Sequence, residues 1–258
     1  MNIKYKGRTR KIERGLTVRK AFAEEIKNSE YEVIGCLYNN DYRNLETPIE
    51  EGANIELIDI SSKEGMKIYV RTIVYIMGKA FESLYPKEKL MVEYQLGNAM
   101  YCKCDNIKIT KEFTEKLKQK MQEIIEKDLP IKKVEMTRKE AQKFYDETDT
   151  SKGRLQFDFE ENDSIYMYYC EKYYNYCFGT LANRTGVIKI FDVVKYANGF
   201  LIRYPSSKEP TKMPEFQETK KLAWALEEFE KIHSVLDVLT VYKLNKAIEE
   251  DRIKDVIM

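Results

Sequence analysis

Hydrophobic residues recur every three or four positions between residues 65 and 84, which predicts a helix with one apolar face. That face is formed by Val70, Ile73, Met77, Phe81 and Leu84. Pro86 follows where the pattern stops, because proline cannot continue a helix. Residues 90–96 and 100–105 have strand patterns, with turn residues at 97–98. The stretch therefore predicts a long helix followed by a β-hairpin.

Residues 1–62 carry several short strand patterns around one helical pattern. Thr17, after a break at Gly15, is placed to cap a helix that runs to about Lys27. Asn and Asp tolerate positive φ, so the polar run 39–41 predicts a turn. The predicted strands cover residues 1–5, 9–13, 32–38 and 54–60. This order favours a β-grasp, a ubiquitin-like sheet that covers one helix.

The remainder of the chain alternates helical and strand patterns. Thr137 and Glu140 have the spacing of a capping box, which predicts a helix running to about Tyr145. A hairpin is predicted with its turn at Asn198 and Gly199. The expected helices cover 110–127 and 218–236, and the expected strands cover 131–136, 165–169, 187–195 and 200–204. With a further helical piece after residue 236, the whole chain is predicted to be α+β.

Composition adds few constraints on function. Among 258 residues, 44 Lys and Arg stand against 43 Asp and Glu, a formal charge of +1. This balance gives no overall basic field to attract nucleic acid, although a basic face can lie within a neutral total. No apolar run is long enough for a membrane span, so we expect no membrane partner. The five cysteines lack a secreted-domain pattern, which indicates free thiols and a cytoplasmic location.

Residues 65–105 resemble the start of the editing domain of threonyl-tRNA synthetases, which is also found in alanyl-tRNA editing proteins. That family carries His-x-x-x-His on the helix, then Leu-Trp/Tyr-Pro, then a hairpin that ends in a tyrosine and acidic residues. The positions that fit this pattern are Gly78, Leu84, Tyr85, Pro86, Gly97, Asn98, Tyr101 and Asp105. Arg71 and Tyr75 stand in the places of the two histidines.

A second family motif, Cys-x-x-x-His, matches at Cys177, with Leu181 in place of its histidine and Asn175 in place of an acidic residue. In the family these groups bind a metal or position a water and the aminoacyl ester. Leucine ligates no metal, arginine stays protonated and tyrosine is a poor base near neutral pH. The resemblance therefore implies a degenerate site with no catalytic residue and no metal. The remaining binding candidates are Arg71, Tyr75, Asn175 and Cys177.

Two interpretations of the helical pair stay open. Arg71 and Tyr75 are one turn apart, and an arginine in a concave site binds a carboxylate or phosphate through two parallel hydrogen bonds. In the plainer alternative, Arg71 pairs with a nearby acid and Tyr75 fills the space of an imidazole. The tyrosine-rich run 166–176 suits either base stacking or sheet packing, and the strand preference of tyrosine favours packing. His233 is expected on or near the surface of a late helix.

Residues 1–62 resemble the TGS domain, which precedes the editing domain in threonyl-tRNA synthetases. The matching residues are Gly15, Thr17, Leu45, Pro48, Ile49, Gly52, Ile55, Glu56, Leu57 and Ile58. The chain as a whole resembles the N-terminal region of bacterial uridine (nucleoside) kinase-like proteins. This implies a TGS-like β-grasp domain in residues 1–62, an editing-like domain in residues 65–236, and a helical connector in residues 237–258 toward a missing kinase domain.

A P-loop is absent from the sequence. The one Gly-Lys pair, Gly78-Lys79, has Ile73 at the first glycine position and Ala80 at the hydroxyl position. This chain therefore cannot phosphorylate a nucleoside by that route. ATP and Mg²⁺ are expected only for the kinase domain, and no cofactor is expected for this chain.

Three functional hypotheses follow. The leading one is a non-catalytic regulatory or substrate-recognition region, whose partner is its own C-terminal kinase domain and whose remnant pocket takes a small anionic ligand or nucleotide. The second is a divergent aminoacyl-tRNA deacylase that uses Cys177 and Tyr75. The third is a tRNA-binding module, which the near-neutral charge disfavours.

Overall fold

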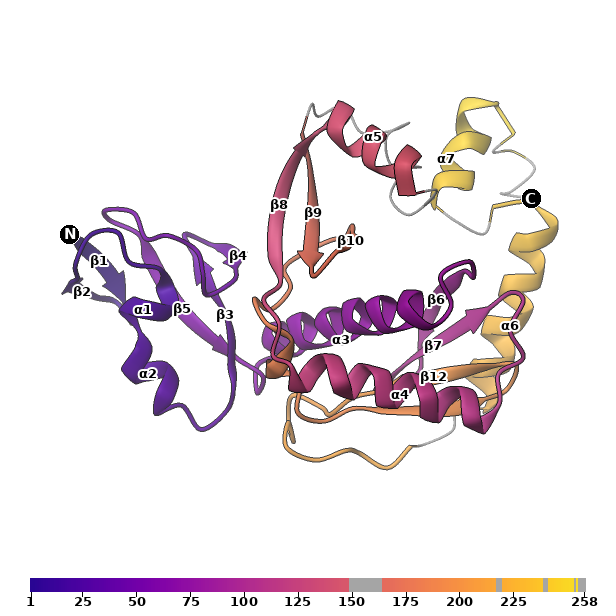
Figure 1. Cartoon of the computed structure of the whole chain (residues 1–258), viewed down its shortest axis with the longest axis horizontal. Helices are drawn as coiled ribbons and strands as arrows, with labels where there is room; N and C mark the ends of the chain where they lie inside the picture. Colours follow the sequence, from indigo (N-terminus) through magenta and orange to yellow (C-terminus); the bar gives the residue numbers. More distant parts are fainter. Residues whose placement is uncertain (149–163, 217–219, 239–240, 253, 255–258) are drawn as a thin grey trace. The chain divides into compact units, whose positions relative to one another are not determined.

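The computed structural model describes residues 1–148, 164–216, 220–238, 241–252 and 254, and its elements confirm the α+β class (Figure 1). The chain divides into two compact units, Met1–Val134 with Tyr166–Glu215, and Glu135–Ile165 with Phe216–Met258. The domain boundaries proposed after residues 62 and 236 stay predictions. Among the described residues, no helix has the length and apolar character needed to cross a membrane.

Five strands form the first sheet of the first unit, in the order β2-β1-β5-β3-β4. They are β1 (Asn2–Tyr5), β2 (Arg8–Lys11), β3 (Val33–Tyr38), β4 (Asp41–Arg43) and β5 (Asn54–Asp59). β1 and β5 are parallel, whereas the other neighbouring pairs are antiparallel. The sequence did not predict β4, which forms because Asn39 and Asn40 adopt positive φ (49° and 67°) and return the chain along β3.

The helix predicted after Thr17 is divided in two, α1 (Val18–Ala21) and α2 (Ala23–Lys27). Phe22, between them, leaves the helical conformation (φ −118°, ψ 28°), and its ring is buried with its centroid 4.7 Å from that of Tyr5. Thr17 occupies the N-cap position, but its hydroxyl makes no capping hydrogen bond, which corrects the expectation from sequence. Packing of the Phe22 ring therefore decides the shape of this segment.

Two long helices, α3 (Lys63–Leu84) and α4 (Lys111–Glu126), pack on a four-stranded sheet in the order β11-β12-β7-β6 (Figure 1). The strands are β6 (Leu90–Gln95), β7 (Ala99–Cys104), β11 (Asp192–Tyr196) and β12 (Gly199–Arg203). Ser62 and Thr110 cap the two helices by accepting hydrogen bonds from the Gly65 and Phe113 amides. The shared core includes Ile73, Met77, Phe81, Cys102, Phe113, Leu117, Met121, Phe200 and Ile202.

A third sheet has the order β10-β9-β8, and the unit boundaries fall within β8 and β9. Its strands are β8 (Lys132–Thr137), β9 (Ser164–Cys170) and β10 (Tyr173–Asn175), and the short 3₁₀ helix η2 covers Thr185–Val187. The second unit contains the helices α5 (Arg138–Thr148), α6 (Lys220–Val235) and α7 (Val241–Glu249). His233 was expected on or near the surface of a late helix, but its side chain lies outside the described part of the structure.

The predicted capping box at the start of α5 is confirmed. The Thr137 amide donates to Glu140 Oε2 (2.8 Å), and the Glu140 amide donates to Thr137 Oγ1 (3.3 Å). The Thr137 amide and hydroxyl both donate to the Glu140 carboxylate, and these two bonds lower its pKa. Two amides at the helix start are therefore satisfied reciprocally.

The late hairpin turns one residue earlier than predicted. Ala197 (φ 47°) lies in the turn, and Gly199 already pairs with Tyr196 in the β11–β12 ladder. A Cβ added at Gly199 would overlap the Cys102 carbonyl oxygen and lie 2.8 Å from the Tyr101 ring. Glycine is needed here because β7 packs closely against it, and the turn itself does not require it.

A second close approach brings the β9–β10 hairpin against α3. A Cβ added at Gly78 would overlap the hydroxyl oxygen of Tyr173. The next residue, Lys79, donates through Nζ to the carbonyl oxygens of Cys170 (2.8 Å) and Glu171 (3.0 Å), at the hairpin turn. Gly78 and Lys79 therefore hold the β9–β10 hairpin on α3.

We expect Gly78→Ala to lower the free energy of unfolding by about 1 kcal/mol in urea titrations. Alanine gains roughly 1 kcal/mol of helix propensity over glycine, but overpacking against a rigid tyrosine costs about 1–3 kcal/mol. In a Tyr173→Phe background the obstructing oxygen is gone, so the same substitution should cost less. Equal effects in both backgrounds would contradict this account of Gly78.

Candidate functional site

The four residues expected in the remnant pocket all lie in the first unit. Arg71 and Tyr75 come from the middle of α3, Asn175 ends β10, and Cys177 follows it. Cys177 packs against the buried cluster that contains Tyr75, and Arg71 is close enough to influence the Cys177 thiol. Asn175 Nδ2 donates to the hydroxyl of Tyr173 (2.9 Å), which faces Gly78 of α3. The structure therefore gathers these residues where α3 meets the end of β10.

Tyr75 is a structural residue in this arrangement. Its side chain is 1% exposed, and its hydroxyl oxygen lies 3.1 Å from the Tyr168 carbonyl and 3.2 Å from the Tyr173 carbonyl. Both are acceptors, so the hydroxyl proton is held between β9 and β10. Burial raises the pKa of Tyr75 above its ordinary value. The phenol is therefore neither ionised at neutral pH nor accessible to a substrate.

Side chains fill the space around Tyr75. Leu181, which stands where the family has a histidine, is fully buried in the same cluster as Ile131 and Cys170. The hydroxyl of Tyr168 donates to the Gly179 carbonyl (3.0 Å) and accepts from the Leu181 amide (3.2 Å). These contacts fix the loop 176–181 against the cluster. The inner part of the expected remnant pocket is therefore filled by side chains.

Arg71 lies at the outer edge of this cluster and is half-buried. Its guanidinium carbon would be only 2.9 Å from a Cβ on Gly179, which has φ +93°, so the guanidinium lies against the loop backbone. Among the described residues, Arg71 has no hydrogen-bond or ion-pair partner, and the acid required by the plainer interpretation is not found there. Arg71 thus presents an unneutralised cation beside the loop 176–181.

Cys177 is not prepared to act as a nucleophile. Burial raises the pKa of its thiol to about 11, although the positive charge of Arg71 lowers it in part. A thiol with this pKa is almost wholly protonated at neutral pH, and the thiolate is the reactive form. Neither the Cys177 thiol nor the Tyr75 hydroxyl is thus ionised at neutral pH, and the deacylase hypothesis stays untested.

The loop also contains features that the sequence interpretation missed. Phe178 is 82% exposed, an unusual position for a large apolar ring, and it directly precedes Gly179. Thr180 Oγ1 donates to the Tyr42 carbonyl of β4 (2.7 Å). Farther along, Asn183 Nδ2 donates to Glu46 Oε1 (2.8 Å). The sequence signal that could have predicted this exposed loop is the pair Phe178-Gly179, between Cys177 and Leu181.

The tyrosine-rich run contributes to both the surface and the core. Tyr168 and Tyr173 are buried and pack edge-on against Tyr75, whereas Tyr166 and Tyr176 are exposed. The Tyr169 and Tyr174 rings contact each other across the β9–β10 pair, with centroids 4.6 Å apart. Packing therefore accounts for most of this run.

No group of three or more His, Cys, Asp or Glu side chains converges within the described residues. The cysteines are free, and Cys102 lies in the core with its sulfur 3.9 Å from that of Met77. Burial raises the pKa of Cys104 to about 12. The expectation that no metal binds in the remnant pocket stays a prediction.

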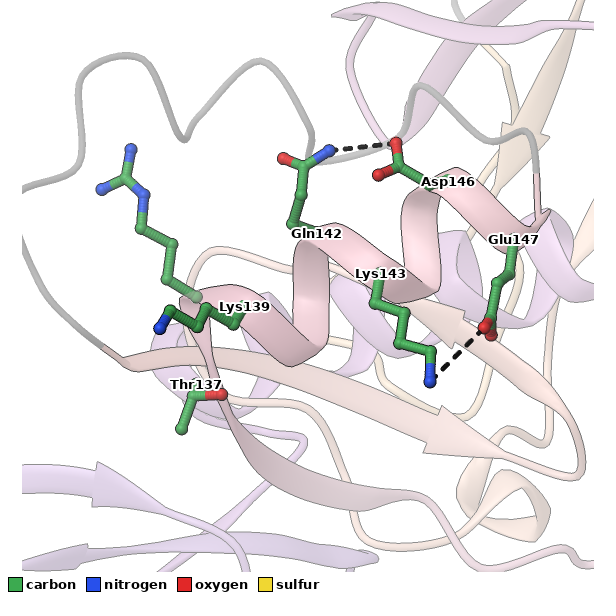
Figure 2. Close-up of a pocket in the computed structure, with 7 residues that line it drawn as sticks. Thr137, Lys139, Gln142, Lys143, Asp146 and Glu147 are labelled. Carbon is green, nitrogen blue, oxygen red and sulfur yellow. Dashed lines mark hydrogen bonds and ion pairs between the residues drawn. The ribbon is translucent and has the colours of Figure 1, made fainter.

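A separate hollow lies along α5 in the second unit (Figure 2). It is lined by Thr137, Arg138, Lys139, Gln142, Lys143, Asp146 and Glu147. Gln142 hydrogen-bonds Asp146 (3.0 Å), and Lys143 pairs with Glu147 (3.7 Å), so these groups satisfy one another (Figure 2). Exposed pairs on one helix contribute little energy and present no convergent ligand groups. We assign this hollow no function.

No family model matches the chain. The chain is similar to the N-terminal part of several threonine–tRNA ligases. The enzyme of Thermotoga petrophila is 28% identical over 208 residues, which are 78% of this chain and 32% of that protein. That of Caldanaerobacter subterraneus subsp. tengcongensis is 27% identical over 196 residues, 75% of this chain and 30% of that protein. That of Aquifex aeolicus is 28% identical over 206 residues, which are 78% of this chain and 32% of that protein.

These similarities extend over about three quarters of this chain. The chain spans about a third of the length of these relatives. It therefore carries a threonyl-tRNA-synthetase-like region. A similarity over a third of the relatives does not assign their activity to this chain.

We expect alkylation of Cys177 by iodoacetamide to be slow at pH 7 and to rise about tenfold per pH unit until the pKa of about 11 is approached. Because the Arg71 charge lowers this pKa, Arg71→Gln should slow alkylation at any fixed pH below it. Peptide mass spectrometry would separate Cys177 from the other thiols. Rapid labelling of Cys177 at pH 7 would contradict the inert state described above.

Proposed function

We propose that this chain is a non-catalytic recognition module for the 3′ end of a tRNA. The observation that carries the proposal is the guanidinium of Arg71, which has no acidic partner among the described residues and borders an exposed loop. The similarity to threonine–tRNA ligases supports tRNA as the class of ligand.

The absence of catalysis in this proposal follows from the state of each candidate group. The Tyr75 hydroxyl is buried and bound to backbone carbonyls, and burial raises the pKa of the Cys177 thiol to about 11. Arg71 cannot act as a base because a guanidinium stays protonated in proteins. Ester hydrolysis requires a positioned base or an activated nucleophile, and loss of such a group typically costs at least about a hundredfold in rate.

Binding uses groups that catalysis does not require. The Arg71 guanidinium suits a phosphate, which it contacts through two parallel hydrogen bonds. The exposed ring of Phe178, in the loop that contacts Arg71, offers a surface on which a nucleobase stacks. A phosphate and an unpaired base occur together at the end of an RNA strand, and this combination supports an RNA end over a simple anion.

A finer proposal concerns the parent protein. The resemblance of residues 237–258 to the connector of nucleoside-kinase-like proteins supports a regulatory or substrate-recognition role beside a C-terminal kinase domain. In that role a bound tRNA end or nucleotide would act as the signal, and the N-terminal sheet would be a TGS-like β-grasp. The test is the coding sequence after Met258, where a P-loop would establish this parentage and its absence would remove it.

We expect no measurable deacylation of tRNA mischarged with serine beyond the rate in buffer. Release of labelled serine would be followed for the purified chain beside a Cys177→Ala variant, and both should be inactive because neither Tyr75 nor Cys177 is available. Robust hydrolysis that the Cys177→Ala variant loses would overturn the non-catalytic proposal and favour the divergent deacylase.

We expect Arg71→Gln to weaken the binding of a fluorescein-labelled tRNA roughly 10- to 100-fold in anisotropy titrations, as suits the loss of a charge-assisted bidentate contact. Phe178→Ala should weaken it about tenfold if one base stacks on the ring.

The matched control is Lys63→Gln, which removes the charge of an exposed lysine on α3, the helix that carries Arg71. A tRNA without its 3′-terminal nucleotides should bind wild type and Arg71→Gln equally, and a difference there would contradict end recognition.

A further inference from the structure

Positive charge is concentrated at the start of a chain that is neutral overall. Residues 1–14 contain six Lys and Arg and one Glu, while the whole chain carries a formal charge of +1. The rest of the chain therefore has an excess of four acidic groups. All six cations lie on or beside the β1–β2 hairpin.

Two of these cations are neutralised within the first unit. Arg10 pairs with Glu25 and stacks 5.1 Å from the Phe22 ring centre, and Arg14 lies 3.8 Å from Glu51. The other four are exposed and have no acidic partner among the described residues: Lys4, Lys6, Arg8 and Lys11.

The hairpin geometry places Lys4 and Lys11 on one face and Lys6 and Arg8 at the turn. Lys4 lies opposite Thr9, and Lys11 is two residues beyond Thr9 on the same face, so Lys4 and Lys11 are diagonal neighbours about 7–8 Å apart by the usual sheet spacing. The buried Ile3 shows that this face is turned away from the core. Lys6 (φ 49°) occupies the turn, and the exposed Arg8 follows it, opposite Tyr5 and on the other face of the hairpin from Lys4. The hairpin lies at the edge of its sheet (Figure 1).

One structural explanation for such charges is protection of the sheet edge. Lysines on edge strands discourage pairing with other chains, and β2 is an edge strand. That role requires cations along β2 only. Lys4 lies on β1, which is paired on both sides, and Lys6 is in the turn, so neither protects the edge. Edge protection therefore accounts for part of the set.

We propose that the β1–β2 hairpin binds the phosphate backbone of an RNA, through Lys4, Lys6, Arg8 and Lys11. The proposal rests on the tRNA-recognition role proposed above and adds a second contact, on a different sheet of the first unit. Lysine and arginine bind backbone phosphates without reading sequence, so the hairpin contributes affinity and the loop beside Arg71 contributes selectivity for the end.

The experiment compares the full chain with a hairpin variant that carries Lys4→Gln, Lys6→Gln, Arg8→Gln and Lys11→Gln. The matched control removes the same charge at four exposed lysines of the same unit: Lys87→Gln, Lys108→Gln, Lys127→Gln and Lys132→Gln. Binding of fluorescein-labelled tRNA is titrated by anisotropy between about 50 and 200 mM salt. Circular dichroism and light scattering report the fold and the oligomeric state of each protein.

The expected result is specific to the hairpin. Each phosphate contact contributes about 0.7–0.9 to the slope of log affinity against log salt, so the hairpin variant should lose about three units of slope. Its affinity at the lowest salt should fall at least about tenfold, while the control variant should keep its affinity within about threefold. This loss should be the same for tRNA with and without its 3′-terminal nucleotides.

Several results would overturn the proposal. Equal losses in both variants would show a general charge effect, and no loss in the hairpin variant would show that the hairpin does not contact RNA. Self-association of the hairpin variant with unchanged RNA binding would assign the charges to edge protection. Hairpin-dependent binding to anionic lipid vesicles without RNA binding would assign the surface to a membrane.

The Arg71→Gln variant separates this proposal from the proposed function. If end recognition is wrong but the hairpin contact is real, Arg71→Gln should bind as wild type while the hairpin variant loses its salt slope. If only the hairpin contact is wrong, Arg71→Gln should weaken binding to intact tRNA while the hairpin variant behaves as the control.

Discussion

Most of helix α3 is enclosed by other elements, and its buried polar side chains need partners inside the protein. Tyr69 accepts hydrogen bonds from the amides of Lys189 (3.0 Å) and Ile190 (2.9 Å), and Thr72 accepts from the Ala182 amide (3.0 Å). An unsatisfied buried polar group costs about 1–3 kcal/mol, so each of these side chains requires the later segment to pass at a fixed place. Residues 168–190 are therefore positioned by α3, and the loop that borders Arg71 is among them.

The same requirement explains the packing around Tyr75. Two imidazoles one turn apart would need solvent, a metal or a substrate to satisfy their nitrogen atoms. Tyr75 satisfies its single hydroxyl with strand carbonyls, and Leu181 needs no partner at all. These replacements exchange reactive groups for packing, while Arg71 keeps a charge at the rim. In the described structure Tyr75 and Leu181 therefore contribute packing, and the proposed binding role is left to the cation of Arg71.

The sequence predicted the elements that have strong local signals. α3 and α4 follow from the periodicity of their apolar residues, and the start of α5 follows from its capping box. It could not predict β4 and β10, three residues each, because such short strands exist only through their neighbours. The break at Phe22 and the shifted turn before Gly199 are likewise set by core packing. The unpaired state of Arg71 depends on which acids are nearby in three dimensions, and one sequence does not contain that information.

Hydrogen bonds from residues 180 and 183 to residues 19, 42 and 46 connect two parts of the first unit that are far apart in sequence. Thr180 holds the Tyr42 carbonyl, and three residues later Asn183 accepts from Arg19 (2.8 Å) while donating to Glu46 (2.8 Å). Any movement of residues 180–183 would have to stretch or break these bonds. A ligand that moved the loop would therefore be linked to the geometry of the N-terminal segment, and by thermodynamic linkage that effect would act in both directions.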